Sequence, residues 1–231
     1  MNELSPIKNL RNLKKDMADM TYGQKLKHIW TYYKWVLVVV LILIMLVSVL
    51  LAAITNKRSI LMLGGVTVNV QLSEEGKAYI GDEYLQTITT GNTREKVVVS
   101  HTDIEDVSQS MLYENNHYAV MSLLALCSNQ EVDFLILDQV GFETMLAQGA
   151  YLGLNQIYTA EELEEMKDVL VYAQNKDETV PSAIALDITD TKFVQENTEE
   201  DGNVYFVYIT NSLRKDTARD FYEYILAYGE E

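Results

Sequence analysis

Residues 132–138, V-D-F-L-I-L-D, are apolar at five of seven positions. Strands that are half exposed alternate apolar and polar side chains, whereas strands buried on both faces form nearly continuous apolar runs. The stretch therefore predicts a central strand of a parallel sheet with helices covering both of its faces.

Similar short runs and helical patterns alternate on either side of this strand. Apolar or alternating runs predict strands at residues 60–63, 66–70, 96–100, 182–188 and 204–210. Helices are predicted at residues 73–89, 106–128, 140–148, 159–173 and 214–228, with a polar hairpin-like connection at 197–203. This alternation predicts one three-layer α/β domain.

Three of the predicted helices carry specific signals. Thr159 and Glu162 fit a capping box at the start of one helix. The spacing of apolar residues predicts the inner face of the 106–128 helix as Val107, Met111, Tyr118, Met121 and Cys127. In the last helix it predicts that Phe221, Tyr224, Ile225 and Tyr228 face the core.

An apolar segment without any charge lies before this domain. Residues 36–54 are 19 residues in which Ser48 is the only polar side chain. As a helix they reach about 28 Å, close to the ~30 Å hydrocarbon core of a bilayer. The run exceeds the roughly 7–15 apolar residues of a cleaved signal peptide, and no small-x-small cleavage site follows it. We therefore expect an uncleaved transmembrane signal anchor.

The charges on the two sides of this segment predict its direction. Residues 1–34 carry seven bases and three acids, a net charge of +4, whereas residues 57–231 carry 11 bases and 31 acids, a net charge of −20. Basic flanks stay in the cytoplasm. We expect a basic cytoplasmic segment (1–34), a transmembrane helix (35–55) and an extracytoplasmic α/β domain (56–231) in the cell membrane.

Aromatic and basic residues precede the apolar run, as is typical of a membrane interface. The residues expected there, in contact with the lipid bilayer, are Trp30, Tyr32, Tyr33, Lys34 and Trp35. They indicate simple anchoring, with specific lipid recognition as the alternative. The first twenty residues fit an amphipathic helix that lies on the inner leaflet or docks to a cytoplasmic partner.

Composition and missing motifs exclude several function classes. A net charge of −16 argues against a nucleic-acid binder, which needs a surplus of Lys and Arg. The single cysteine, Cys127, excludes an intrachain disulfide and a multi-cysteine metal site, and its apolar setting favours a core residue over a nucleophile. The sequence contains none of the common hydrolase, zincin, P-loop or dinucleotide motifs, so we expect no enzyme and no cofactor.

Two stretches resemble a known family. Residues 131–157, a strand ending in Asp followed by a helix and G-A-Y-L-G-L, are similar to a segment of extracellular solute-binding proteins of ABC importers. Residues 183–193 and 204–226 resemble the later hinge and closing helix of those proteins. The Y-Y-K-W at residues 32–35 also resembles the start of the membrane segment in single-pass proteins of Clostridia-like Gram-positive bacteria.

The resemblance implies a single lobe of a periplasmic-binding-protein fold. Solute-binding proteins insert a second lobe between the two stretches, but here only about 25 residues separate Ile157 from Ala183. Because ligand capture by domain closure requires two lobes, we do not expect this chain to trap a ligand in that way.

Polar side chains at the strand ends are the candidate ligand-binding residues, because open parallel sheets bind ligands at their carboxyl ends. They are Gln71, Ser73, His101, Asp138 and Gln139, with Asn69, Ser100 and Thr102 beside them. The alternative is that they only cap local backbone. His101 with Asp103, Glu105 and Asp106 also suggests a divalent cation, but acids commonly begin helices and we expect no metal.

These observations together predict a bitopic envelope protein. We expect its ectodomain to be a non-enzymatic interaction module, an accessory subunit of a membrane complex such as an ABC-type transporter. The alternative is a receptor for a small polar solute, namely a sugar, an amino acid or a peptide; an envelope hydrolase is a third, remote hypothesis. Twelve tyrosines in residues 57–231 suit either protein and carbohydrate contacts or ordinary packing.

Overall fold

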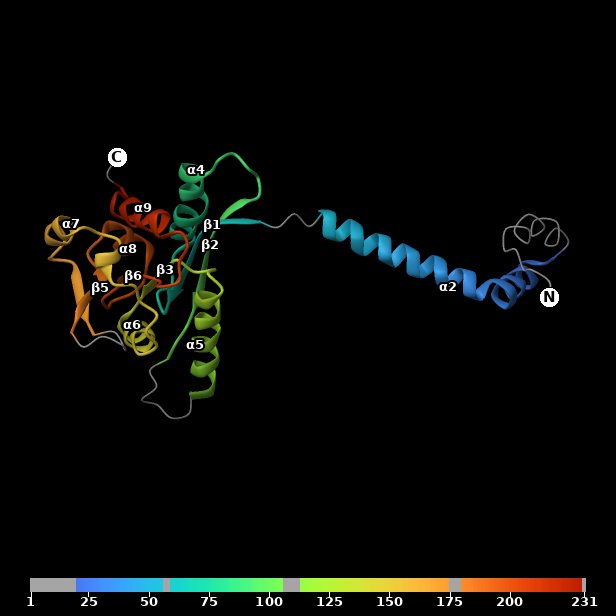
Figure 1. Cartoon of the computed structure of the whole chain (residues 1–231), viewed down its shortest axis with the longest axis horizontal. Coiled ribbons are helices and arrows are strands. Elements are labelled where there is room, and N and C mark those ends of the chain that lie inside the picture. The colour runs from blue at the N-terminus through green and yellow to red at the C-terminus, as the bar shows by residue number, and fades with distance from the viewer. Residues whose placement is uncertain (1–19, 56–58, 106–112, 175–179, 230–231) are drawn as a thin grey trace. The chain divides into compact units, whose positions relative to one another are not determined.

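The computed structural model describes residues 20–55, 59–105, 113–174 and 180–229 (Figure 1). The chain divides into two compact units, Met1–Arg58 and Ser59–Glu231. The predicted amphipathic helix in the first twenty residues lies almost entirely outside the described residues.

The first unit contains one helix, α2 (Tyr22–Thr55), among its described residues. Within it, every side chain from Val38 to Leu51 is exposed, and thirteen of these fourteen are apolar. The exception, Ser48, donates its hydroxyl to the carbonyl oxygen of Ile44 at 2.8 Å. Taken over the residues that the structure describes, none of the helices is sufficiently long and apolar to cross a membrane.

The second unit is built on a six-stranded sheet of order β2-β1-β3-β6-β5-β4. Its strands are β1 (Ile60–Val68), β2 (Glu95–Thr102), β3 (Phe134–Leu137), β4 (Leu170–Ala173), β5 (Ser182–Asp187) and β6 (Tyr205–Tyr208). Strand β1 pairs in parallel with β2 and β3, whereas β6 pairs antiparallel with both β3 and β5, and β4 pairs antiparallel with β5. The α/β class is confirmed, but the sheet is mixed and not wholly parallel.

Two hydrophobic cores lie on opposite faces of this sheet. Along β3, Phe134 and Ile136 enter one core while Leu135 and Leu137 enter the other. The prediction that this strand is buried on both faces is therefore confirmed. The antiparallel direction of β6 beside β3 was not predicted. An apolar strand indicates that helices cover both faces of the sheet, but it does not indicate the direction of the adjacent strand.

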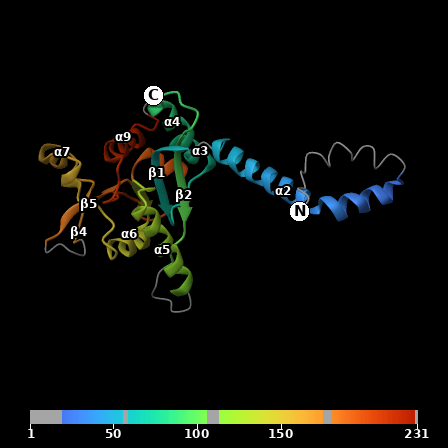
Figure 2. The same cartoon turned by 45° about the vertical axis from the view of Figure 1, so that its right-hand side comes forward.

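Helices cover both faces, so the unit has three layers (Figures 1 and 2). One layer contains α5 (Tyr113–Ser128) and α6 (Gln139–Leu146). The other contains α3 (Glu74–Ala78), the π-helical turn η1 (Tyr79–Glu83), α4 (Tyr84–Ile88), α8 (Lys192–Asn197) and α9 (Lys215–Leu226). A 3-10 turn, η2 (Leu154–Gln156), leads to α7 (Ala160–Glu165).

The capping box at the start of α7 is confirmed, but the predicted extent of that helix is wrong. Thr159 accepts a hydrogen bond from the Glu162 N–H, and the Glu162 carboxylate accepts one from the Thr159 N–H. The helix ends at Glu165, and the chain then forms edge strand β4. The β-branched residues Val169 and Val171 favour this extended structure over continued helix.

The predicted inner face of α5 is confirmed at Cys127 and wrong at Tyr118 and Met121. Tyr118 is 73% exposed and Met121 is 51% exposed, whereas Leu123 and Cys127 are buried. Val107 and Met111 lie outside the described residues. In α9 the buried side chains are Ala218, Phe221, Tyr222 and Ile225, with Tyr224 and Tyr228 half-buried against the same core.

Candidate functional site

A cluster of polar side chains joins the carboxyl ends of β1 and β3, and its members hydrogen-bond to one another and to nearby backbone. Asn69, whose φ of 61° is left-handed, accepts a hydrogen bond from the Ile104 N–H and donates to the Ile104 carbonyl and to Asp138. Asp138 also accepts from the Gly141 N–H at 2.7 Å and so caps α6. The side chains of Asn69 and Asp138 thus lie together and bond to each other and to nearby backbone.

Two more of the predicted residues also have partners inside the fold. Ser73 accepts from the Gly76 N–H, which caps α3, and donates to Asn197 at 3.0 Å. The Gln139 amide donates to Glu143, and its oxygen accepts from the Tyr205 hydroxyl at 2.6 Å. These contacts are those of capping and packing residues.

His101 bridges two neighbours. Its Nδ1 is 2.8 Å from the Thr67 hydroxyl and its Nε2 is 3.0 Å from Asp103 Oδ1. Asp106, another candidate metal ligand, lies outside the described residues. Among the residues that are described, no three His, Cys, Asp or Glu side chains come together to hold a metal ion.

Gln71 is exposed and lines two cavities beside these strand ends. A small one of about 80 Å³ includes Thr67 and His101, and a larger one of about 380 Å³ includes Ser73 and Asn197. Asp138 and Gln139 line neither of them. Of the predicted ligand-binding residues, Gln71, Ser73 and His101 therefore line these two cavities.

A buried ionic network lies near the start of β3, and no sequence pattern indicated it. Asp133 has no exposed surface and accepts hydrogen bonds from Gly64 N, Ser212 Oγ and Arg214 Nε at 2.7, 2.7 and 2.8 Å. Arg214 also donates to the Gln130 carbonyl. The network ties β1 to the start of α9, which indicates a structural role.

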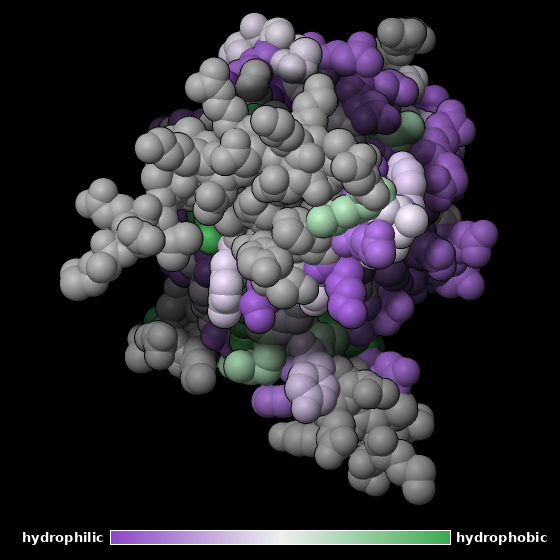
Figure 3. Space-filling view, turned by 90° about the vertical axis from the view of Figure 1, so that its right-hand side faces the viewer, coloured by the Kyte–Doolittle hydropathy of each residue, from purple (hydrophilic) through white to green (hydrophobic). Residues whose placement is uncertain are grey.

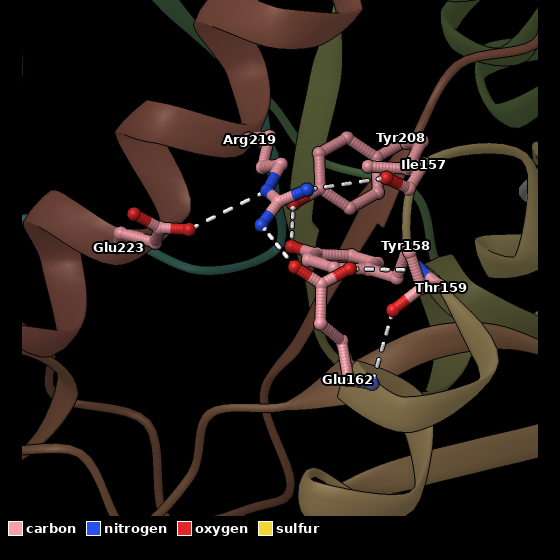
Figure 4. Close-up of polar contacts among 7 residues, drawn as sticks. All are labelled: Ile157, Tyr158, Thr159, Glu162, Tyr208, Arg219 and Glu223. Carbon is pink, nitrogen blue, oxygen red and sulfur yellow. Dashed lines mark hydrogen bonds and ion pairs between the residues drawn. The ribbon is translucent and has the colours of Figure 1, made fainter.

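A second cluster joins α7 to α9 around Arg219 (Figure 4). The guanidinium lies over the Tyr158 ring, 4.9 Å from its centroid, and pairs with Glu162 at 2.6 Å. The hydroxyls of Tyr158 and Tyr208 are 2.6 Å apart. Burial raises the pKa of Tyr158 to about 12 and raises that of Tyr208 further, so both phenols stay protonated at neutral pH.

A cavity larger than these two lies elsewhere, in the helical layer, and was not predicted. It has a volume of about 500 Å³ and we call it the Tyr–Glu groove. Its six acidic and aromatic lining residues are Glu75, Tyr79, Glu83, Glu196, Tyr224 and Tyr228. The spacing of Glu75, Tyr79 and Glu83 at i, i+4 and i+8 would have indicated a shared helix face, but Glu196 and the two later tyrosines come from distant segments.

The remaining predicted residues are those of the membrane interface and the cysteine. In α2, Lys34 is exposed, and Trp30 and Trp35 are 69% and 73% exposed. The side chains of Tyr32 and Tyr33 lie outside the described set. Cys127 is buried, and burial raises the pKa of its thiol to about 11, which opposes nucleophilic chemistry.

Comparison with known proteins adds no relative. No protein-family model, no curated protein and no solved structure matches this chain significantly. The resemblance to solute-binding proteins therefore stays a prediction.

Proposed function

We propose that the chain is a single-pass protein of the cell envelope, anchored by residues 36–54 and exposing its α/β unit outside the cytoplasm. The observation that carries this proposal is the run of exposed apolar side chains from Val38 to Leu51. Burying one fully exposed large apolar side chain is worth about 1.5–3 kcal/mol, and these thirteen are 44–71% exposed, so leaving them in water would cost roughly 10–20 kcal/mol. Only an apolar surrounding offsets a cost of that size.

The polar groups of α2 are compatible with a bilayer. Helical backbone satisfies its own hydrogen bonds, which is a requirement inside a bilayer. Ser48 is satisfied by the Ile44 carbonyl. The seven bases before the run and the acidic unit after it favour a cytoplasmic N-terminus.

We propose further that the α/β unit is a non-enzymatic interaction module, an accessory subunit of a membrane complex such as an ABC-type transporter. The resemblance to one lobe of a solute-binding protein supports the transporter context. The strand-end polar groups support interaction over chemistry, because Asn69, Asp138 and Ser73 all bond to neighbouring groups of the fold. The coloured residues that are visible in Figure 3 are mostly hydrophilic.

A receptor for a small polar solute is the second candidate. It is favoured by the cavity of about 380 Å³ at the strand ends, which Gln71 and Ser73 line. A solute bound there would stabilise the folded unit by mass action. Thermal unfolding of the full-length protein against sugars, amino acids and short peptides tests this candidate; no shift across the panel would remove it.

Membrane attachment is tested by fractionation. We expect the wild type in the membrane pellet, released by detergent and not by alkaline carbonate or high salt. The double variant Leu43→Lys and Val47→Lys should move to the soluble fraction, because each lysine at mid-membrane costs about 2.5–3.5 kcal/mol. Tyr22→Lys is the matched control and should stay in the membrane. Wild type in the soluble fraction would refute the anchor.

Orientation and partnership need separate measurements. A reporter fused after Glu231 should be active only outside the cytoplasm, and cytoplasmic activity would reverse the proposed topology. Purification in mild detergent should recover transporter subunits in stoichiometric amount with the chain. Recovery of the chain alone would count against a stable complex.

A further inference from the structure

The Tyr–Glu groove is formed where two parts of one helical layer meet. The segment α3-η1-α4 lies beside α9 in both cartoon views (Figures 1 and 2). The Tyr79 hydroxyl donates to the Tyr224 carbonyl at 3.0 Å across this junction. Residue Glu196 of α8 completes the lining.

Three tyrosine rings of the groove pack on one another. The Tyr79 ring stacks on Tyr224 with centroids 4.5 Å apart, and it meets Tyr228 edge to face at 4.7 Å. All three side chains are half-buried and line the cavity. Tyr79 opens a π-helical turn, and such turns are rare and frequently occur at functional sites.

The charged residues that line the groove are all acidic. The lining includes three exposed carboxylates, from Glu75, Glu83 and Glu196, and no basic residue. Lys192 stands at the rim, where its Nζ is 3.2 Å from the Gly229 carbonyl oxygen and 3.9 Å from Glu196. An ammonium group therefore already lies at one edge of the groove.

We propose that the Tyr–Glu groove binds a lysine or arginine side chain presented by a partner polypeptide, an inference that rests on the proposed interaction role. Aromatic faces attract cations, and carboxylates supply the opposite charge. A volume of about 500 Å³ lies within the ~300–1,000 Å³ of typical ligand sites, and the groove accepts the apolar stem of such a side chain against its rings. An anionic ligand would be repelled by all three glutamates.

The test uses the full-length protein in nanodiscs of zwitterionic lipid and a fluorescent pentalysine peptide. Fluorescence anisotropy should show binding, and a pentapeptide of Nε-acetyl-lysine should bind at least tenfold more weakly because it lacks the charge. Equal binding of the two peptides would overturn the proposal. Free lysine amide should bind more weakly than the peptide; equal affinity would assign the groove to small amines and overturn the polypeptide partner.

Charge variants separate the groove from the overall acidity of the protein. The triple variant of Glu75, Glu83 and Glu196 to Gln should weaken pentalysine binding about tenfold. The matched triple variant of α7, with Glu161, Glu164 and Glu165 changed to Gln, alters net charge equally and should change binding less than twofold. Similar losses in the two would show non-specific attraction and overturn the site.

Two further positions test the rings and the rim. Tyr228→Phe keeps the aromatic face and should bind as the wild type does, whereas Tyr228→Leu should lose about three- to tenfold in affinity. Lys192→Met removes the competing ammonium and should tighten binding about two- to fivefold. Loss of affinity in Lys192→Met, or full affinity in a folded Tyr228→Leu, would overturn the proposal.

A failure of the groove to bind the peptide can be distinguished from a failure of the proposed function. Peptide binding is measured without any membrane partner, so its absence in a membrane-anchored chain removes only the groove as a site. If the chain proves soluble in fractionation, the same titration in buffer still tests the groove.

Discussion

Removal of the buried carboxylate at Asp133 is expected to destabilise the α/β unit by about 3–4 kcal/mol. Asp133→Ala leaves Gly64 N and Ser212 Oγ without their acceptor and leaves Arg214 without its ion-pair partner. Loss of one partner from a buried ion pair typically costs about 3–5 kcal/mol. We expect the lower part of that range because the Arg214 side chain is 20% exposed and retains its bond to the Gln130 carbonyl.

The assay is thermal unfolding of the full-length protein in mild detergent, followed by tyrosine near-ultraviolet circular dichroism. Both tryptophans, Trp30 and Trp35, lie in α2, whereas twelve of the fifteen tyrosines lie in residues 57–231, so the tyrosine signal reports the α/β unit. For a unit of this size each kcal/mol lowers the midpoint by roughly 2–4 °C, so a fall of about 6–16 °C is expected.

A second variant and a control make this result specific. Arg214→Met should be similarly destabilising, and the double variant with Asp133→Ala should lose less than the sum of the two because the residues interact directly. Glu74→Gln breaks only an exposed pair with Lys77 and should leave the midpoint unchanged. A loss below about 1 kcal/mol in Asp133→Ala, or full additivity, would refute the network as a source of stability.

Three other predictions follow from packing and burial. Gly64→Ala should cost about 3 kcal/mol or more in the same unfolding assay because the added Cβ would overlap the Glu131 carbonyl oxygen. Gly81→Ala, with open space around it, should be neutral or stabilising by up to ~1 kcal/mol. Tyr158→Phe should cost about 1–2 kcal/mol, since the buried Tyr208 hydroxyl loses its partner; an unchanged midpoint would contradict this. Cys127, with a pKa of about 11, should react with iodoacetamide at pH 8 only after unfolding, because roughly one thiol in a thousand is ionised; rapid native labelling would show that it is accessible.

Strands β3 and β6 were predictable because their signal is local. In β3 and β6 successive side chains enter opposite cores, and both sequences are apolar throughout. The antiparallel direction of β6 was not predictable, since it depends on how the chain returns through α8 and the connection after it. Residues 170–173 were mistaken for helix because the acidic helix before them has no glycine or proline at its end.

The faces of the helices were less predictable than the helices themselves. Helix α5 carries apolar residues around most of its circumference, so the spacing of these residues does not single out one buried face. For this reason the predicted burial of Tyr118 and Met121 is wrong. In α9 the polar residues are more regularly spaced, and the expected burial of Phe221 and Ile225 is confirmed. The buried face of a helix can therefore be predicted from sequence when its opposite face is clearly polar.

The candidate residues show a similar division between local and distant information. Asp138 was identifiable as the residue that ends a strand and begins a helix, but its partner Asn69 lies 69 positions earlier in the chain. The Tyr–Glu groove depends even more on tertiary structure, because residues near positions 75–83, 196 and 224–228 meet only after folding. Residue spacing within one helix indicates which side chains lie on the same face of that helix. Only the folded structure shows which distant segments lie against that face.

The position of the groove bears on how the unit could function. At the strand ends of β1 and β3, where an open sheet usually binds ligands, Asn69 and Asp138 are hydrogen-bonded to each other and to nearby backbone. The groove lies instead in the helical layer, where three carboxylates and three tyrosines line a cavity. Such a site holds a side chain of another molecule against its surface without any closure of the protein. Under the proposed function, such a site could act on a protein fixed to a membrane, because it would need only its partner to come within reach.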